Sequence, residues 1–341
     1  MITIEKKMST EQEKKKRVNL SLNLLRLLAI LLIINSHSDI FYPGSIRFLA
    51  SGGAIGNGLF FALSGYFFHI KGNKKNALLN RFFKLFVPVW IMTGLSLVFK
   101  EIKITDAVDA VRLLIWPTRF WFVGAVFLYY VLLTIIPKRY SVDQKKNFVF
   151  LMGLLVVLDL AVWFCLIPEK TTWIVEDARL FRIVPFKVIY CFMEFAAGYY
   201  IGRNKKSCSV WIAALLSVAT FGGFYGFKFL LNKGVVPMEL QILSQPLTVV
   251  CVISILLTFI GIDLNKSLED KKVGNAINFL SGLSLETYVV QFLIIAGVHS
   301  MNLKFPVNVM LSTVFIFIAA WILNMIDRVI HNKICKSLKL T

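Results

Sequence analysis

Two ionisable residues, Arg26 and His37, lie in the first long apolar segment of the chain. They are eleven positions apart, which is almost three turns of an α-helix, so both side chains project from the same face. Their Cα atoms then lie about 16 Å apart along the helix axis, roughly half the thickness of a bilayer core. Because ionisable groups inside a membrane are costly, this aligned pair predicts a site that reaches from within the membrane toward one surface.

Each residue also has a simpler interpretation. Arg26 lies only two turns into the segment and could extend its charge to the nearer interface. A histidine at a helix end near water is more often interfacial than catalytic, and we interpret His299 in that way. His37 is better placed, because the polar residues from Asn35 to Asp39 surround it, and Asp39 could orient its imidazole.

The composition predicts an all-α integral membrane protein. Hydrophobic residues make up 57% of the chain, only 17% of residues are charged, and the mean hydropathy is +0.71. A soluble domain is about half apolar, and a β-barrel shows alternating segments instead of long apolar runs. The five cysteines show neither CxxC pairs nor metal-like spacing, so we predict neither a metal site nor a disulfide.

Ten apolar segments are near the length that a helix needs to cross a bilayer. They are approximately 19–38, 49–70, 85–100, 120–137, 147–167, 186–202, 209–230, 243–262, 282–300 and 307–327. Of the 38 lysines and arginines, 25 lie in the segments that share a side with the N-terminus and 12 lie on the other side. The positive-inside rule therefore places both termini in the cytoplasm, and it explains the net charge of +19 without nucleic acid.

This topology gives one membrane domain, residues 18–328, between basic cytoplasmic tails at 1–17 and 329–341. The third apolar segment is expected to start on the cytoplasmic side with Arg81 and Lys84, which most simply anchor it there. Glu194 and Glu286 lie deeper, and either could pair with a basic residue.

The second apolar segment is rich in small residues, with Gly52, Gly56 and Ser64 at helical spacing. Such spacing usually allows close helix packing, although it could also leave a slot for a narrow ligand.

At these residues the chain resembles the acyltransferase 3 family of bacterial membrane proteins. Arg26 and His37 fit the family's Arg, ten residues, His pattern, and Gly58–Tyr66 is similar to its glycine-rich second motif. Three later matches are weaker: Arg81 to Lys84 with Pro88, Trp121 with its neighbours, and Ser284 to Gln291. Lys84 replaces a second arginine, and Gln291 stands where histidine is common and cannot shuttle a proton.

The resemblance implies transfer of an acyl group, usually acetyl, from cytoplasmic acyl-CoA to a sugar hydroxyl of a surface glycan. It implies the bacterial cytoplasmic membrane, no bound cofactor, and an association with polysaccharide synthesis. The site residues it implies are His37 and Arg26 for catalysis; Arg81, Lys84, Ser64 and Gly65 for the donor; and Asp39, Glu286, Gln291 and Trp121 as polar support.

A transporter or flippase of a lipid-linked glycan is the alternative, since Glu194 and Glu286 could relay protons. The chain shows no inverted repeat that would favour it. A membrane sensor module is a third, weaker interpretation.

Overall fold

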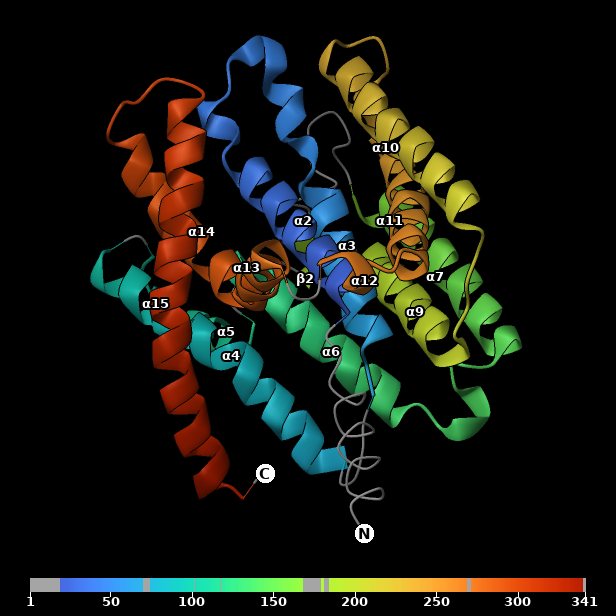
Figure 1. Ribbon diagram of the computed structural model, residues 1–341, viewed down its shortest axis with the longest axis horizontal. Coiled ribbons are helices and arrows are strands. Elements are labelled where there is room, and N and C mark those ends of the chain that lie inside the picture. The colour runs from blue at the N-terminus through green and yellow to red at the C-terminus, as the bar shows by residue number, and fades with distance from the viewer. Residues whose placement is uncertain are drawn as a thin grey trace.

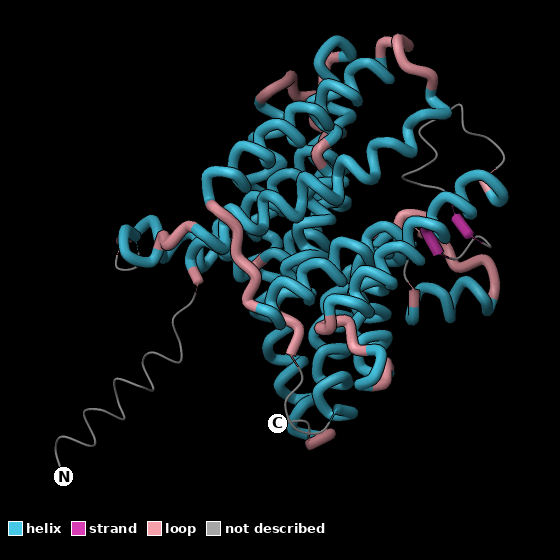
Figure 2. The backbone as a smooth tube through the Cα atoms, turned by 90° about the vertical axis from the view of Figure 1, so that its right-hand side faces the viewer, coloured by secondary structure: helices cyan, strands magenta, loops and turns pink. Residues whose placement is uncertain are grey.

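The computed structural model describes residues 19–69, 74–100, 102–116, 118–167, 179–180, 184–268 and 271–339. Helices make up most of this part of the chain (Figure 2). The protein is therefore an all-α polytopic membrane protein, as the composition predicts.

The main helices are α2 (Leu20–His37), α3 (Gly53–Tyr66), α4 (Lys74–Val98), α5 (Ala107–Ile115), α6 (Trp121–Ile135), α7 (Lys145–Leu166), α9 (Val188–Asn204), α10 (Val210–Asn232), α11 (Ser244–Gly261), α12 (Asn265–Leu268), α13 (Lys272–Gly282), α14 (Ser284–His299) and α15 (Val307–Ser337). Short 3₁₀ helices are η1 (Asp39–Phe41), η2 (Gly44–Ser51), η3 (Thr118–Phe120), η4 (Lys138–Tyr140) and η5 (Met238–Leu243). Strands β1 (Arg179–Leu180) and β2 (Val184–Pro185) form one antiparallel pair, with Arg179 opposite Pro185.

Seven helical stretches in the described residues are long and apolar enough to cross a membrane. An eighth span is possible if α13 and α14, which meet at a bend of 67°, cross together. Helix α6 is apolar but shorter, with 15 residues, and α9 has 17 residues. Each of the ten expected segments contains a helix, while the number of crossings and the side of each terminus stay predictions.

Two predicted boundaries differ from the structure. Helix α4 begins at Lys74, so Arg81 and Lys84 lie two turns or more inside the helix rather than at its start. Helix α15 continues to Ser337, so the predicted tail at 329–341 begins within a helix, whereas the tail at 1–17 lies outside the described residues. The apolar pattern missed both extensions because their amphipathic turns are rich in lysine, arginine and asparagine.

Helices α2 and α3 pack together in the middle of the molecule (Figure 1). Helices α14 and α15 lie to one side of this pair, and α9, α10 and α11 lie to the other (Figure 1). The helix with Arg26 and His37 is thus enclosed by neighbours, which can complete a site around it.

The small residues of α3 serve close packing. A Cβ on Gly56 would lie 2.7 Å from the Ala29 carbonyl oxygen of α2. A Cβ on Gly65 would overlap the Phe195 carbonyl oxygen of α9, and one on Gly198 would overlap the backbone of α3. At these glycines the packing interpretation is confirmed, because helix backbones occupy the space a ligand would need.

Hydrogen bonds hold the first turn of α2 against distant parts of the chain. The Leu20 backbone N–H donates to Asn265 Oδ1 over 2.9 Å, and Asn23 Nδ2 donates to Asn278 Oδ1 over 2.8 Å. These contacts fix the axial position of α2, and with it the height of Arg26.

Candidate functional site

A cavity of about 740 Å³ lies beside the first half of α2. It is lined by seven helices, because α2, α3, α4, α6, α13, α14 and α15 all contribute side chains or backbone. The lining residues are Arg26, Phe60, Ser64, Asn80, Arg81, Lys84, Leu85, Phe122, Val126, Tyr130, Gly282, Ser284, Leu285, Glu286, Tyr288, Asn324, Asp327, Arg328, His331 and Asn332. The cavity therefore brings together predicted site residues from four separate motifs.

One part of the lining is basic. Arg26 comes from α2, Arg81 and Lys84 come from α4, and Arg328 comes from α15. Four cationic side chains around one cavity favour an anionic ligand, and guanidinium groups are suited to phosphate oxygens.

Arg81 is held in place on two sides. Its Nη2 donates to the His69 carbonyl oxygen over 3.0 Å. Its guanidinium carbon lies 4.7 Å from the ring centre of Tyr130 and 4.9 Å from that of Phe68. Those ring contacts fix the plane of the guanidinium while leaving other N–H groups for a ligand.

Helices α14 and α15 contribute acidic and amide side chains to the cavity. Asn324 Nδ2 donates to Glu286 Oε1 over 2.5 Å, and both side chains are buried. Asp327, one turn further along α15, also lines the cavity. The sequence suggested that Glu286 could pair with a basic residue. In the described residues its carboxylate instead accepts a hydrogen bond from the Asn324 amide.

His37 lies outside the cavity, at the other end of α2. Its ring meets the ring of Phe292 from α14 edge to face, with the centroids 4.6 Å apart. The guanidinium carbon of Arg119 lies 5.4 Å from the centre of the same ring. His37 and Arg119 therefore share one aromatic neighbour.

A file of aromatic rings connects the two places. Tyr288, which lines the cavity, contacts Phe120 at a centroid distance of 6.3 Å. Phe120 contacts Phe292 at 5.9 Å, and Phe292 contacts His37. We call Tyr288, Phe120 and Phe292 the aromatic file; it leads from the cavity to His37.

Besides His37, four predicted residues lie away from the cavity lining. Asp39 bonds Arg47 through Nε at 3.1 Å and Nη2 at 2.5 Å, so that this arginine engages the carboxylate expected to orient His37. Trp121 packs on Phe61 and lies under Lys187 Nζ at 4.5 Å. Gln291 is fully buried, with Nε2 donating to the Tyr288 carbonyl oxygen over 3.0 Å. Gly65 packs against α9.

Glu194 is likewise separate from this site. It is fully buried in α9 and lies against Gly58 of α3 and Val252 of α11.

The sequence reasoning missed several contributors. Arg119 is not among the residues predicted from the sequence, although it immediately precedes the Phe-Trp-Phe stretch at 120–122. Asn324, Asp327 and Arg328 are not among them either. Their spacing of three and four residues was the available signal, since such residues share a helix face.

These features define a polytopic helical membrane protein with a basic cavity at one end of α2 and a histidine at the other. The profile of the acyltransferase domain that defines the acyltransferase 3 family matches residues 19–325. The chain belongs to this family and is a membrane acyltransferase. No curated protein and no solved structure matches it.

Proposed function

We propose that this protein transfers an acetyl group from cytoplasmic acetyl-CoA to a hydroxyl group of a surface glycan, within the bacterial cytoplasmic membrane. The observation that carries the proposal is that a cavity containing Arg26, Arg81 and Lys84 is connected to His37 in two ways. Helix α2 carries both Arg26 and His37, and the aromatic file leads from the cavity to His37.

The donor's phosphates are assigned to the basic part of the cavity. Coenzyme A carries phosphate groups, and Arg81 with Lys84 supplies fixed positive charge from one helix face. Ser64 contributes a hydroxyl to the same cavity, and Arg26 lies on α2, the helix that also carries His37. This arrangement matches the positive-inside prediction that the Arg26 end faces the cytoplasm.

The donor's thioester is assigned to the His37 end. His37 lies about 16 Å beyond Arg26 along α2, a distance that a slender pantetheine arm must cover. The aromatic file gives that arm an apolar surface to follow, with few polar groups to desolvate.

At the thioester, His37 accepts the proton of the acceptor hydroxyl as its oxygen attacks the carbonyl carbon. A new C–O bond forms, the C–S bond breaks, and the coenzyme A thiolate leaves and is protonated. Attack by His37 itself, giving a transient acyl-histidine that the sugar then cleaves, is the second route. Both routes require His37.

The test is transfer of radiolabelled acetyl from acetyl-CoA by the purified protein in lipid nanodiscs. We expect slow acetyl-CoA hydrolysis without acceptor and ester formation on the glycan of the producing cell. A glycan flippase would neither bind nor hydrolyse acetyl-CoA, so absence of both overturns the proposal.

Chemical analysis of the surface glycan from cells with and without the gene identifies the ester. Loss of an O-acetyl group supports the assignment, and loss of a different acyl group would correct the donor.

A further inference from the structure

The pantetheine arm of the proposed donor is not entirely apolar, because it carries two amide groups. An amide N–H that leaves water for the interior of a membrane protein needs a hydrogen-bond acceptor there. Four covalent bonds separate the nearer amide nitrogen from the thioester carbon, and they span about 5 Å when extended. A buried, unpaired acceptor at about that distance from the level of His37 would therefore mark the path of the arm.

Asn57 of α3 supplies such an acceptor. Its side-chain Oδ1 is buried and has no hydrogen-bond partner among the described residues. Buried polar atoms are nearly always paired, so this oxygen indicates a donor from outside the chain, either a ligand group or water. The place of Asn57 on α3 distinguishes between these two donors.

Asn57 lies on the face of α3 that borders the cavity. Ser64, which lines the cavity, is almost two turns further along α3, so the two side chains project within about 20° of each other and about 10 Å apart along the axis. Phe60 lies between them, also lines the cavity, and contacts Phe122 at a centroid distance of 5.9 Å. Phe122 in turn contacts Tyr288 of the aromatic file at 5.4 Å. This face of α3 therefore follows the same route as the aromatic file.

The other end of this face meets α2 beside His37. Gly53 begins α3, and a Cβ on Gly53 would lie 2.7 Å from Ser36 Cβ. Ser36 immediately precedes His37, so the start of α3 is at the level of the proposed reaction. Asn57 is four residues further along α3, about 6 Å from that level. This agrees with the distance of about 5 Å from the thioester carbon to the nearer amide nitrogen.

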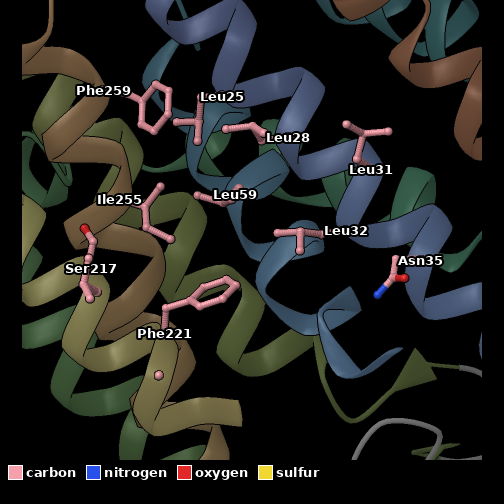
Figure 3. A pocket seen from close by; sticks show the side chains of 12 residues that line it. Leu25, Leu28, Leu31, Leu32, Asn35, Leu59, Ser217, Phe221, Ile255 and Phe259 are labelled. Carbon is pink, nitrogen blue, oxygen red and sulfur yellow. The ribbon is translucent and has the colours of Figure 1, made fainter. Parts of the chain in front are cut away.

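A second hollow beside α2 offers no unpaired acceptor among its lining side chains. It has a volume of about 630 Å³ and lies between α2 and the pair α10 and α11 (Figure 3). Of its polar side chains, Asn35 bonds the Leu49 carbonyl oxygen at 2.8 Å and the Tyr42 hydroxyl, and Ser217 bonds the Ala213 carbonyl oxygen at 2.7 Å. An arm in this hollow would leave its amide N–H groups unpaired, which favours the route beside Asn57.

We propose that Asn57 binds the pantetheine amide nearest the thioester, its Oδ1 accepting the amide N–H and its Nδ2 donating to the amide carbonyl oxygen. This pair of hydrogen bonds sets the height of the thioester beside His37. The inference rests on the proposed function, since it takes acetyl-CoA as the donor.

The experiment is a double-mutant cycle between the protein and the donor. Asn57→Leu removes both hydrogen-bonding atoms and keeps a side chain of similar size. Two acetyl-CoA analogues each carry an ester oxygen in place of one amide N–H, the first analogue at the amide nearest the thioester and the second at the other amide. Thioester hydrolysis of acetyl-CoA and of both analogues is measured with the full-length protein in lipid nanodiscs.

For the wild-type protein, the first analogue should lower kcat/KM by about 2- to 10-fold, the effect of one hydrogen bond. Asn57→Leu should be slower with acetyl-CoA and should use acetyl-CoA and the first analogue equally well. The second analogue should lower kcat/KM by the same factor in both proteins. If Asn57→Leu distinguishes acetyl-CoA from the first analogue as well as the wild-type protein does, water occupies Oδ1 and the proposal is overturned.

Two further variants test the assignment to Asn57. Thr248→Val is the matched control, because it removes a buried hydroxyl of α11 that already donates to the Ser244 carbonyl oxygen at 2.7 Å, and it should leave the discrimination unchanged. Gln291→Leu tests a buried acceptor next to Phe292, since Gln291 Oε1 also has no partner among the described residues. Discrimination that disappears in Gln291→Leu and persists in Asn57→Leu assigns the contact to α14 and overturns the proposal.

The cycle also separates this inference from the proposed function. If Asn57→Leu does not fold, Asn57→Ala gives the same measurement with a residue that favours the helix. Hydrolysis with equal discrimination in every protein removes only the Asn57 contact and leaves the proposed function standing. A wild-type protein that neither binds nor hydrolyses acetyl-CoA overturns both.

Discussion

His37 and Phe292 meet edge to face, with ring centroids 4.6 Å apart and planes inclined by 62°. The contact joins the end of α2 to the middle of α14, and Arg119 lies over the same phenyl ring at 5.4 Å. One phenylalanine thus positions an imidazole and a guanidinium at the far end of the aromatic file. We expect acyl transfer to take place beside His37, Phe292 and Arg119.

Replacing His37 by alanine should abolish transfer while the protein still inserts and folds. Loss of a general base typically lowers the rate by about 10²- to 10⁴-fold. The measurement is acetyl transfer at saturating acetyl-CoA, alongside thermal unfolding in detergent. His299→Ala is the control, because His299 also ends a helix and its ring lies 6.0 Å from that of Phe41, outside the aromatic file. Wild-type transfer by the His37 variant would exclude both proposed routes.

Arg81→Ala should weaken use of the donor rather than the chemical step. A charged hydrogen bond contributes about 1.5–3 kcal/mol, which corresponds to a rise of roughly 10- to 100-fold in the KM for acetyl-CoA. Arg81→Lys should recover part of this loss, since the charge stays while the planar contact with Tyr130 is lost. Arg139→Ala, outside the cavity lining, serves as control. An unchanged KM in Arg81→Ala would remove the phosphate assignment.

Arg119→Ala should affect turnover rather than donor binding, because Arg119 lies beside Phe292 and outside the cavity lining. Negative charge develops on the thioester carbonyl oxygen during attack, and a nearby cation stabilises it. We expect kcat to fall by roughly 10- to 100-fold with the KM for acetyl-CoA unchanged. Arg112→Ala, whose guanidinium pairs with Asp109 in α5, is the matched control. A higher KM with normal kcat would instead assign Arg119 to the donor.

Gly65→Ala should destabilise the protein, although alanine normally favours a helix over glycine by about 1 kcal/mol. The new Cβ would overlap the Phe195 carbonyl oxygen, so α3 and α9 must separate. Gly153→Ala in α7 is the opposite case, since its Cβ would meet nothing within 4 Å. Thermal unfolding in detergent should therefore show a lower Tm for the first variant and an equal or higher Tm for the second. Equal shifts would contradict the packing assignment of Gly65.

The sequence was sufficient to predict the helical membrane fold and the basic part of the cavity lining. Long apolar runs require helices in a bilayer, where every backbone polar group must be satisfied within its own segment. The motif around Arg81 and Lys84 identified the basic lining, although the start of α4 was placed too late. A hydropathy pattern does not predict that a helix continues through turns rich in lysine and asparagine.

Asp39 shows what a local pattern leaves out. Its nearness to His37 in the sequence predicts an orienting contact, and the structure adds Arg47 of η2, which donates to the Asp39 carboxylate. Residues two apart on a helix do not face each other, and no local sequence pattern predicts a contact with the arginine eight positions away.

By itself, the sequence determined that Arg26 and His37 share one face of one helix, because helical periodicity is a local property. Only the tertiary structure decided that Arg26 opens into a cavity with Glu286 and Asn324, while His37 rests against Phe292. Those neighbours come from α14 and α15, more than 240 residues away in the chain, and such pairings depend on how helices pack rather than on any local pattern.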